Sequence, residues 1–343
     1  MKTKIVFCQF IVIFASALLV SCSINDENFY DAKVYIVGGN DITEEITPNS
    51  VLWINDDIVE LFPNPSVVNS VYVDGEDVYT AGCELDDHWV GNPYAALWKN
   101  GNITILSQSI SCAFDVFVRG KVYVVGYESN SNNFFATLWI DGVATRLSVA
   151  NSYAYSVYVS RGNVYVVGII KNSNSDYNAV VWVNGIQTVL STLPSSAHSV
   201  FVKNDNVYIA GKEDGQAILW VNGVATTLST NYSIARSVFV TNNNTVYVAG
   251  DNNNIATLWK DGVSTALSTN YANARGATGY SSAKDIFVVR NKVYVAGIAS
   301  ELLDHRCGFP MLWIDGEEQI LPTEDITRFI DPFNFYITGL FVK

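Results

Sequence analysis

The stretch Ser237–Leu267 reads SVFVTNNNTVYVAGDNNNIATLWKDGVSTAL, and it decides the fold because most of the chain repeats its pattern. It holds four short apolar runs, S-V-F-V, V-Y-V-A-G, A-T-L-W and V-S-T-A-L, which are rich in β-branched and aromatic residues. Such short runs, without a helical period, predict β-strands. Polar turns separate the runs, among them Asp261-Gly262, a dipeptide that favours tight hairpins. Each copy therefore predicts four antiparallel strands.

Seven copies of this unit follow one another between Val34 and Val342. The V-Y-x-x-G run ends at Gly38, Gly82, Gly126, Gly168, Gly211, Gly250 and Gly297. A tryptophan follows each glycine, at Trp53, Trp98, Trp139, Trp182, Trp220, Trp259 and Trp313, and a leucine lies eight residues beyond each tryptophan. A four-stranded repeat of about 40 residues is typical of β-propellers.

The order of the runs favours a closed ring over a linear β-solenoid. The first copy begins directly with V-Y-I-V-G and lacks the S-V-Y-V run, whereas the chain ends in an unpaired run, Gly339–Val342. The last run can therefore complete the first blade, a closure that an open solenoid would not need. We predict an all-β, seven-bladed propeller of four-stranded antiparallel blades over residues 33–343, with the S-V-Y-V run as the innermost strand of each blade.

The N-terminal segment predicts export and lipid anchoring. Residues 1–21 carry two lysines and then an apolar run too short to span a bilayer, as in a secretory signal peptide. Leu19-Val20-Ser21-Cys22 resembles the lipobox of bacterial lipoproteins, which implies cleavage before Cys22 and lipidation of its thiol. We expect residues 22–32 to form a tether and the protein to lie in the cell envelope, with Ser23 favouring the outer membrane. The formal net charge of −13 argues against nucleic acid as a partner.

The repeat resembles that of bacterial kelch-like propeller lipoproteins over the whole mature chain. Only Gly38-Gly39 matches the double glycine of kelch repeats, and the tyrosine here precedes the repeat glycine instead of following it. The chain also lacks the W-D pair of WD repeats and the S-x-D-x-G-x-T-W box of sialidase-like propellers. The resemblance therefore implies a fold but transfers no function.

Loop lengths predict where ligands bind. Within each blade, the first-to-second and third-to-fourth strand turns share one face, and they are short. The second-to-third strand loops and the blade crossovers share the other, which we call the long-loop face. Variable loops on a rigid scaffold commonly carry binding sites. Trp89 lies outside the repeat register, and the loops of blades 2, 6, 7 and 1 place aromatic and polar residues on this face. The ligand-binding candidates are Asp86, His88, Trp89, Tyr280, Asp304, His305, Arg306, Phe309, Arg328 and Tyr336.

A second candidate site is the mouth of the central channel. The residue immediately before each S-V-Y-V run varies in chemistry while its geometric position is fixed, as in a ring that reads a ligand. Drift would give the same variation. These channel-mouth candidates are Asn69, Phe114, Tyr155, His198, Arg236 and Lys284, with Thr338 at the same position of the last run.

The sequence carries no signature of catalysis, metal binding or a cofactor. No C-x-x-C or H-x-x-x-H spacing supports zinc, and no Ser-His-Asp order or phosphate-binding glycine loop is present. Cys83 and Cys112 could form a disulfide in an oxidising envelope, or remain buried thiols. We expect a lipid-anchored binding or interaction module for a glycan. The alternatives are a protein-assembly scaffold, and a polysaccharide hydrolase or lyase using Asp86, Asp304 or Glu324.

Overall fold

The computed structural model describes residues 32–40, 50–62, 65–86, 92–130, 133–267, 269, 280–300, 308–322 and 335–343. The chain divides into two units, Met1–Asp31 and Ala32–Lys343. The first unit, with the predicted signal peptide, Cys22 and most of the tether, lies outside the described residues. No helix among the described residues has the length and apolar character needed to cross a membrane.

The described residues of the second unit form twenty-eight strands in seven antiparallel four-stranded sheets. The innermost (A) strands are β28 (Phe335–Val342), β4 (Ser66–Asp74), β8 (Ser111–Val118), β12 (Ser152–Ser160), β16 (Ser195–Lys203), β20 (Ser233–Val240) and β24 (Tyr280–Val289). The B strands are β1 (Val34–Asn40), β5 (Asp77–Leu85), β9 (Val122–Asn130), β13 (Asn163–Lys171), β17 (Asn206–Glu213), β21 (Val246–Asn252) and β25 (Lys292–Ser300). The C strands are β2 (Ser50–Ile54), β6 (Pro93–Lys99), β10 (Asn133–Ile140), β14 (Tyr177–Val183), β18 (Gln216–Val221), β22 (Ile255–Lys260) and β26 (Phe309–Ile314). The outer (D) strands are β3 (Asp57–Leu61), β7 (Asn102–Ile105), β11 (Val143–Arg146), β15 (Ile186–Val189), β19 (Val224–Thr227), β23 (Val263–Ala266) and β27 (Glu317–Ile320).

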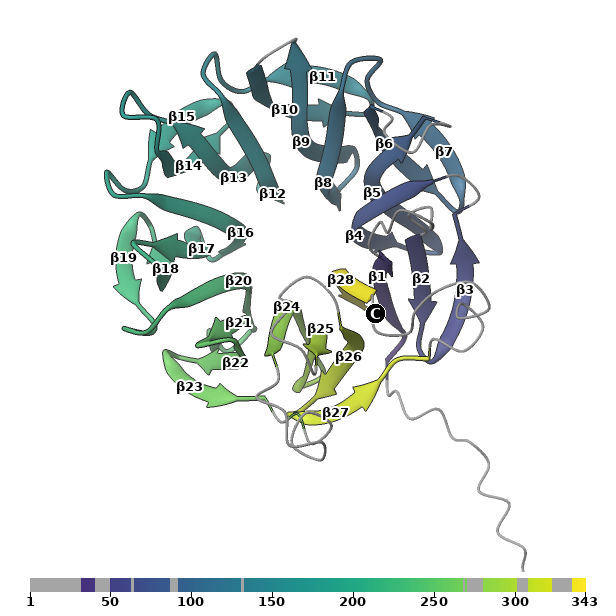
Figure 1. The fold of residues 1–343 in the computed structure, drawn as a ribbon, viewed down its shortest axis with the longest axis vertical. Coiled ribbons are helices and arrows are strands. Elements are labelled where there is room, and N and C mark those ends of the chain that lie inside the picture. Colours follow the sequence, from purple (N-terminus) through teal and green to yellow (C-terminus); the bar gives the residue numbers. More distant parts are fainter. Residues whose placement is uncertain are drawn as a thin grey trace, which may run out of the picture. The chain divides into compact units, whose positions relative to one another are not determined.

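The ring closes through its C-terminal strand, as the sequence predicts. Blade 1 has the strand order β28-β1-β2-β3, and Val34 of β1 pairs with Val342 of β28 (Figure 1). Two reciprocal backbone hydrogen bonds of 2.9 Å between Lys33 and Lys343 extend this ladder. The seven-bladed propeller and its closure are therefore confirmed.

Asx-Gly turns shape the face of short turns. Asn222 and Gly223, for example, both have positive φ, at 52° and 82°, as a tight hairpin turn requires. The Asn222 side-chain oxygen accepts a 2.9 Å hydrogen bond from the Val207 N–H at the start of the neighbouring B strand. The same side-chain bond recurs at Asn55, Asn100, Asp141, Asn184, Asp261 and Asp315. These hydrogen bonds hold the turns in one conformation. Because the turns are short, this face carries no long loops.

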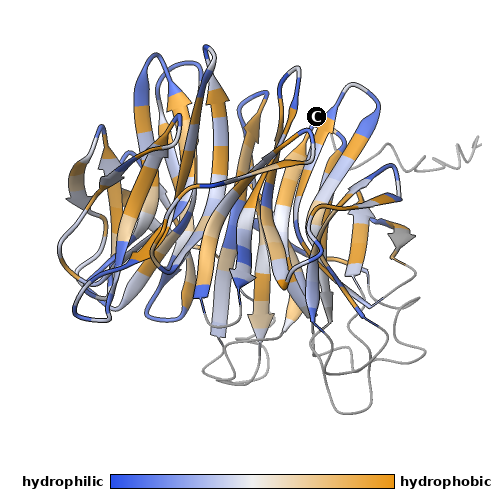
Figure 2. Ribbon diagram, turned by 90° about the horizontal axis from the view of Figure 1, so that it is seen from above, coloured by the Kyte–Doolittle hydropathy of each residue, from blue (hydrophilic) through white to orange (hydrophobic). Residues whose placement is uncertain are grey.

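The core lies between blades. Trp220 is fully buried in one cluster with Val167 and Ala179 of the preceding blade. Trp139 likewise packs with Tyr79 and Ala81 of its preceding blade. Apolar strands run through the whole thickness of the ring, with polar turns at both ends (Figure 2). The near-continuous apolar strands of the sequence are explained by this packing, which covers both faces of each sheet.

Candidate functional site

Every A strand contains a β-bulge at the residue that the sequence singles out as a channel-mouth candidate. In blade 2, Val68 pairs with Gly82 and Ser70 pairs with Ala81, which leaves Asn69 as the extra residue. The register shifts at the same place in all seven blades. The bulge residues are Asn69, Phe114, Tyr155, His198, Arg236, Lys284 and Thr338. A bulge re-aims side chains, and here it directs seven varied ones toward the channel.

The bulge in each A strand explains why the paired position on the B strand is a glycine in every repeat. A Cβ at Gly211 would lie 2.0 Å from the backbone oxygen of Ser196, and a Cβ at Gly126 would lie 1.9 Å from that of Cys112. Comparable clashes would arise at the other five repeat glycines. The kinked A strand therefore brings its carbonyl into the space that a side chain would need, so only glycine fits opposite.

The seven bulge residues, together with Tyr336 and Ile337, line a cavity of about 350 Å³. This size lies in the range of small-molecule binding sites. The bulges sit near the starts of the A strands, where the crossovers arrive, so the cavity opens toward the long-loop face. The structure thus brings all six channel-mouth candidates together. Their role in binding stays a prediction.

A second ring of polar side chains lies one residue deeper. It consists of Ser70, Asp115, Ser156, Ser199, Ser237 and Asp285, with Gly339 in the seventh place, and it lines a cavity of about 110 Å³ below the mouth. Asp115 accepts hydrogen bonds from the Ser70 hydroxyl at 2.7 Å and the Val157 N–H at 2.9 Å. Because these donors belong to blades 2 and 4, the carboxylate of Asp115 in blade 3 joins three blades.

Asp285 repeats this arrangement at the closure of the ring. It accepts hydrogen bonds from the Ser237 hydroxyl at 2.6 Å and from the N–H of Leu340, in the closing strand, at 2.8 Å. Burial raises the pKa of both carboxyl groups, that of Asp285 to about 6, although the surrounding donors oppose the shift. All of these bonds are structural, so we assign the two carboxylates to holding blades together.

An aromatic cluster extends outward from the mouth across blades 3 and 4. Its members are Phe114, Tyr127, Phe134, Tyr153, Tyr155 and Tyr177, and all are partly exposed. Neighbouring ring centroids lie 5.3 to 6.3 Å apart, within the range of favourable aromatic pairs. Burial raises the pKa of Tyr155 and Tyr127, so both hydroxyl groups stay neutral.

Next to the aromatic residues, the mouth is lined by the polar side chains of His198 and Arg236. The His198 ring stacks on Tyr155 with centroids 5.7 Å apart and an interplanar angle of 17°. Burial and the nearby positive charges of Arg236 and Lys212 lower the pKa of His198 to about 3, so this ring is neutral. The Arg236 Nε donates to Asp251 at 2.9 Å, so the next side chain in the ring is a positioned guanidinium.

The ligand-binding candidates predicted on the long-loop face do not lie in one place. Some lie at the mouth cavity, some lie in or beside the blades, and the others fall outside the described residues. Tyr336 lines the mouth cavity, and Tyr280, only 4% exposed, is hydrogen-bonded to Arg236. Phe309 packs against a core cluster, and Asp86 is exposed at the end of β5. His88, Trp89, Asp304, His305, Arg306 and Arg328 lie outside the described residues, so their grouping stays a prediction.

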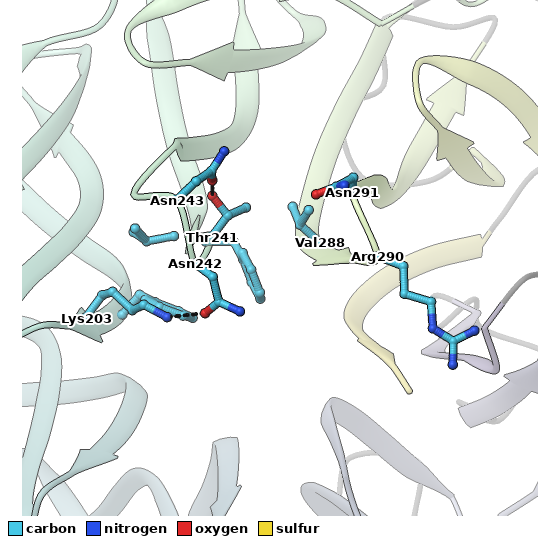
Figure 3. Close-up of a pocket in the computed structure, with 10 residues that line it drawn as sticks. Lys203, Thr241, Asn242, Asn243, Val288, Arg290 and Asn291 are labelled. Carbon is cyan, nitrogen blue, oxygen red and sulfur yellow. Dashed lines mark hydrogen bonds between the residues drawn. The ribbon is translucent and has the colours of Figure 1, made fainter.

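The opposite end of the channel is aromatic. Seven rings, Tyr72, Phe117, Tyr158, Phe201, Phe239, Phe287 and Phe341, form a closed circle with neighbouring centroids 4.8 to 5.0 Å apart. A cavity of about 470 Å³ opens beside Phe201 and Phe239 at the short turns of blades 5 to 7. Figure 3 shows Lys203 bonded to Asn242 on one side of it, while the Arg290 side chain extends away from that pair.

Cys83 and Cys112 lie at the seam of blades 2 and 3. Both are buried free thiols, and their sulfur atoms are 2.6 Å apart. Asn69 of the mouth donates to the sulfur of Cys112 at 3.5 Å and to Ala113 O at 2.8 Å. The cysteine pair therefore contacts the binding candidate Asn69 through the sulfur of Cys112. Formation of a disulfide stays a prediction.

Comparison with known proteins shows the fold alone. A puromycin-hydrolysing peptidase from Mycobacterium tuberculosis aligns with a TM-score of 0.52 at 9% identity, covering 83% of this chain and 53% of the peptidase. The extracellular domain of BT4673, a candidate one-component system from B. thetaiotaomicron, gives 0.48 at 9% identity, covering 90% of this chain and 39% of that one. Hydrazine synthase from Kuenenia stuttgartiensis gives 0.45 at 9% identity, covering 67% and 43%.

This chain thus spans only 39% to 53% of the length of these three structures. No family model matches the chain, and no curated protein matches it. The resemblance to kelch-like lipoproteins is therefore supported only as far as the propeller fold. Within the described residues, no group of three or more His, Cys, Asp or Glu side chains could hold a metal ion.

The structure differs from the sequence prediction in the local structure of the mouth candidates. The sequence sets each of them before its A strand, whereas the structure sets them inside it, because every A strand begins three or more residues earlier. It also misses Tyr127, Phe134, Tyr153 and Tyr177. The signal for Tyr153 is its position two residues before Tyr155, since alternate residues share a face of a strand. The other three come from neighbouring strands and carry no comparable signal.

Proposed function

We propose that the protein is a lipid-anchored binding module of the bacterial cell envelope that takes a glycan at the mouth of its propeller channel. The observation that carries the proposal is the aromatic cluster leading into a cavity of about 350 Å³. Sugar rings present C–H faces that pack on aromatic side chains, while neighbouring polar groups fix the hydroxyl groups. Asn69, Thr338 and Arg236 supply such groups around the same cavity.

Each of these polar side chains is positioned by the propeller itself. The Thr338 hydroxyl donates to Val68 O at 2.7 Å, and the Asn69 amide donates to Ala113 O at 2.8 Å. Both bonds cross to the next blade. Side chains held in this way lose little conformational entropy when a ligand binds, which favours selective recognition.

The anchoring part of the proposal rests on the lipobox-like residues at Cys22. The first described residues lie beside the C-terminus, on the face of short turns, because Lys33 is bonded to Lys343. The chain therefore enters the propeller on the face opposite the mouth.

A protein partner is the second candidate function, and a separate observation favours it. The crossovers that precede β8, β12, β16 and β20 each expose one apolar side chain. These are Ile110, Val149, Leu193 and Tyr232, with exposed fractions of 37%, 94%, 49% and 65%. They form an arc outside the mouth, and exposed apolar residues gathered on one face can mark a docking site.

A glycan array probed with the purified propeller separates the two functions. We expect Tyr155→Ala to weaken glycan binding at least tenfold, the equivalent of about 1.4 kcal/mol, and Tyr232→Ala to leave it unchanged. Circular dichroism and thermal melting verify that both variants fold. Equal binding by wild type and Tyr155→Ala would refute the mouth as the glycan site. Loss of partner capture only in Tyr232→Ala would favour the protein-docking function.

A further inference from the structure

A cavity of about 470 Å³ lies at the short turns of blades 5 to 7, on the face opposite the mouth, and we call it the short-turn cavity. It is larger than the mouth cavity of about 350 Å³, and no residue lines both. Two neighbouring members of the aromatic circle, Phe201 and Phe239, line it, together with the buried side chains of Val240 and Val288. The short-turn cavity thus combines an apolar lining with the size of a small-molecule site.

The turn between β20 and β21 gives this cavity a polar side, and it is longer than the turns beside it. Five residues, 241–245, separate these two strands, whereas two residues separate β16 from β17 and two separate β24 from β25. The Thr241 hydroxyl oxygen accepts from the Thr245 N–H at 3.1 Å, and the Thr241 N–H donates to the Thr245 oxygen at 3.0 Å. Asn242 and Asn243 line the cavity from this braced turn, so little backbone freedom is lost when a ligand binds.

The asparagine amides around the cavity present both donors and an acceptor. The Asn242 oxygen accepts from the Lys203 ammonium at 2.5 Å, and the Asn243 oxygen accepts from the Thr241 hydroxyl. Within the described part of the chain, no group accepts a hydrogen bond from the NH₂ of either asparagine. Asn291 lies across the cavity from them, on blade 7 (Figure 3), and its amide bonds to no other described residue. It therefore offers a ligand an oxygen as well as an NH₂ group.

These groups match the hydroxyl groups of a sugar better than they match an ion. A hydroxyl accepts from an amide NH₂ and donates to an amide oxygen, whereas an ionised carboxylate cannot donate to Asn291. The described residues that line the cavity include no aspartate or glutamate to attract a cation. Lys203 is already bonded to Asn242, and the Arg290 side chain extends away from this pair (Figure 3). The C–H face of a sugar ring can pack on the exposed part of Phe239.

We propose that the short-turn cavity is a second carbohydrate site, in which a neutral sugar packs against Phe239 and bonds to the three asparagine amides. The inference goes beyond the proposed function, because it needs neither the mouth nor the aromatic cluster of blades 3 and 4. The two sites lie on opposite faces of the propeller and share no lining residue. One protein molecule can therefore hold two glycan chains at once.

Saturation-transfer difference NMR tests the inference with four neutral disaccharides, maltose, cellobiose, mannobiose and chitobiose. Tyr155→Ala removes the mouth site, and Asn242→Ala with Asn243→Ala removes the amides of the short-turn cavity. We expect Tyr155→Ala to bind at least one disaccharide still, and the triple variant to bind it at least about tenfold more weakly. Asn102→Ala, at an exposed asparagine on the same face but outside the cavity, should leave the Kd of Tyr155→Ala unchanged. Thermal melting verifies that each variant folds.

The outcomes separate this site from the mouth. If the wild type binds a disaccharide and Tyr155→Ala binds none, the second site is refuted and the proposed function stands. If Tyr155→Ala binds as well as the wild type and the triple variant does not, the second site is supported and the mouth is refuted. Binding that survives both asparagine substitutions overturns the inference. If the wild type binds none of the four disaccharides, the inference also fails, and the glycan array alone decides on the mouth.

Discussion

Asp285 links the closing strand β28 to the neighbouring blades through hydrogen bonds, and the substitution Asp285→Asn tests how much these bonds contribute. Its Oδ1 accepts from the Ser237 hydroxyl at 2.6 Å and the Ile286 N–H at 2.8 Å, and its Oδ2 accepts from the Leu340 N–H at 2.8 Å. An amide has only one acceptor atom. Asp285→Asn must therefore turn an NH₂ group toward a backbone N–H and leave that N–H unpaired. An unpaired buried donor costs about 1–3 kcal/mol.

The pH dependence of stability gives a second signature. Burial raises the pKa of Asp285 to about 6, so between pH 4 and pH 6 the folded state binds more protons than the unfolded state. This group's contribution to the unfolding free energy therefore falls as pH rises through that window, by about 3 kcal/mol in all, and is constant above about pH 7. Asparagine does not titrate. The variant should lack this part of the pH dependence.

Hydrogen exchange and urea unfolding together test the reasoning. We expect the amides of β28 to exchange roughly 5- to 150-fold faster in Asp285→Asn. Asp115→Asn is the matched control, because its partners Ser70, Val116 and Val157 repeat the same geometry away from the closing strand. Equal exchange of β28 in both variants would refute closure by Asp285. An unchanged pH dependence in Asp285→Asn would refute its titration.

Three further predictions concern other parts of the chain. Oxidation should join Cys83 and Cys112, lowering the mass by about two hydrogens and stabilising the fold by about 3–4 kcal/mol. Labelling of both Cys83 and Cys112 by a thiol reagent, after unfolding under oxidising conditions, would disprove this. Gly211→Ala should lower the free energy of unfolding in urea by more than about 3 kcal/mol, because its Cβ would lie 2.0 Å from a backbone oxygen. Gly223→Ala, at a turn with open space, should lower it by only about 1–2 kcal/mol. Similar losses in the two variants would contradict the role of the bulge. Cys22→Ala should abolish incorporation of labelled fatty acid and release the protein from the membrane fraction, and persistent labelling would rule out Cys22 as the lipid site.

The bulge also explains why the site could be only partly predicted. A strand with strict alternation shows its two faces in the sequence, but an extra residue reverses the alternation at that point. Asn69 and Ser70 are adjacent in sequence, yet both line the channel. The sequence pattern therefore predicts the positions of the varied residues, but it does not predict where each A strand begins.

The sequence alone determined the repeat, the number of blades, the closing strand and the places of the buried tryptophans, because each depends on periodic local patterns and on chain order. Tertiary structure decided which side chains meet. The aromatic cluster joins residues of β8, β9, β10, β12 and β14, and the Asp251–Arg236–Ser282 network joins two blades. Such contacts depend on strand register and on the packing of one blade against the next, and no local pattern in the chain encodes them.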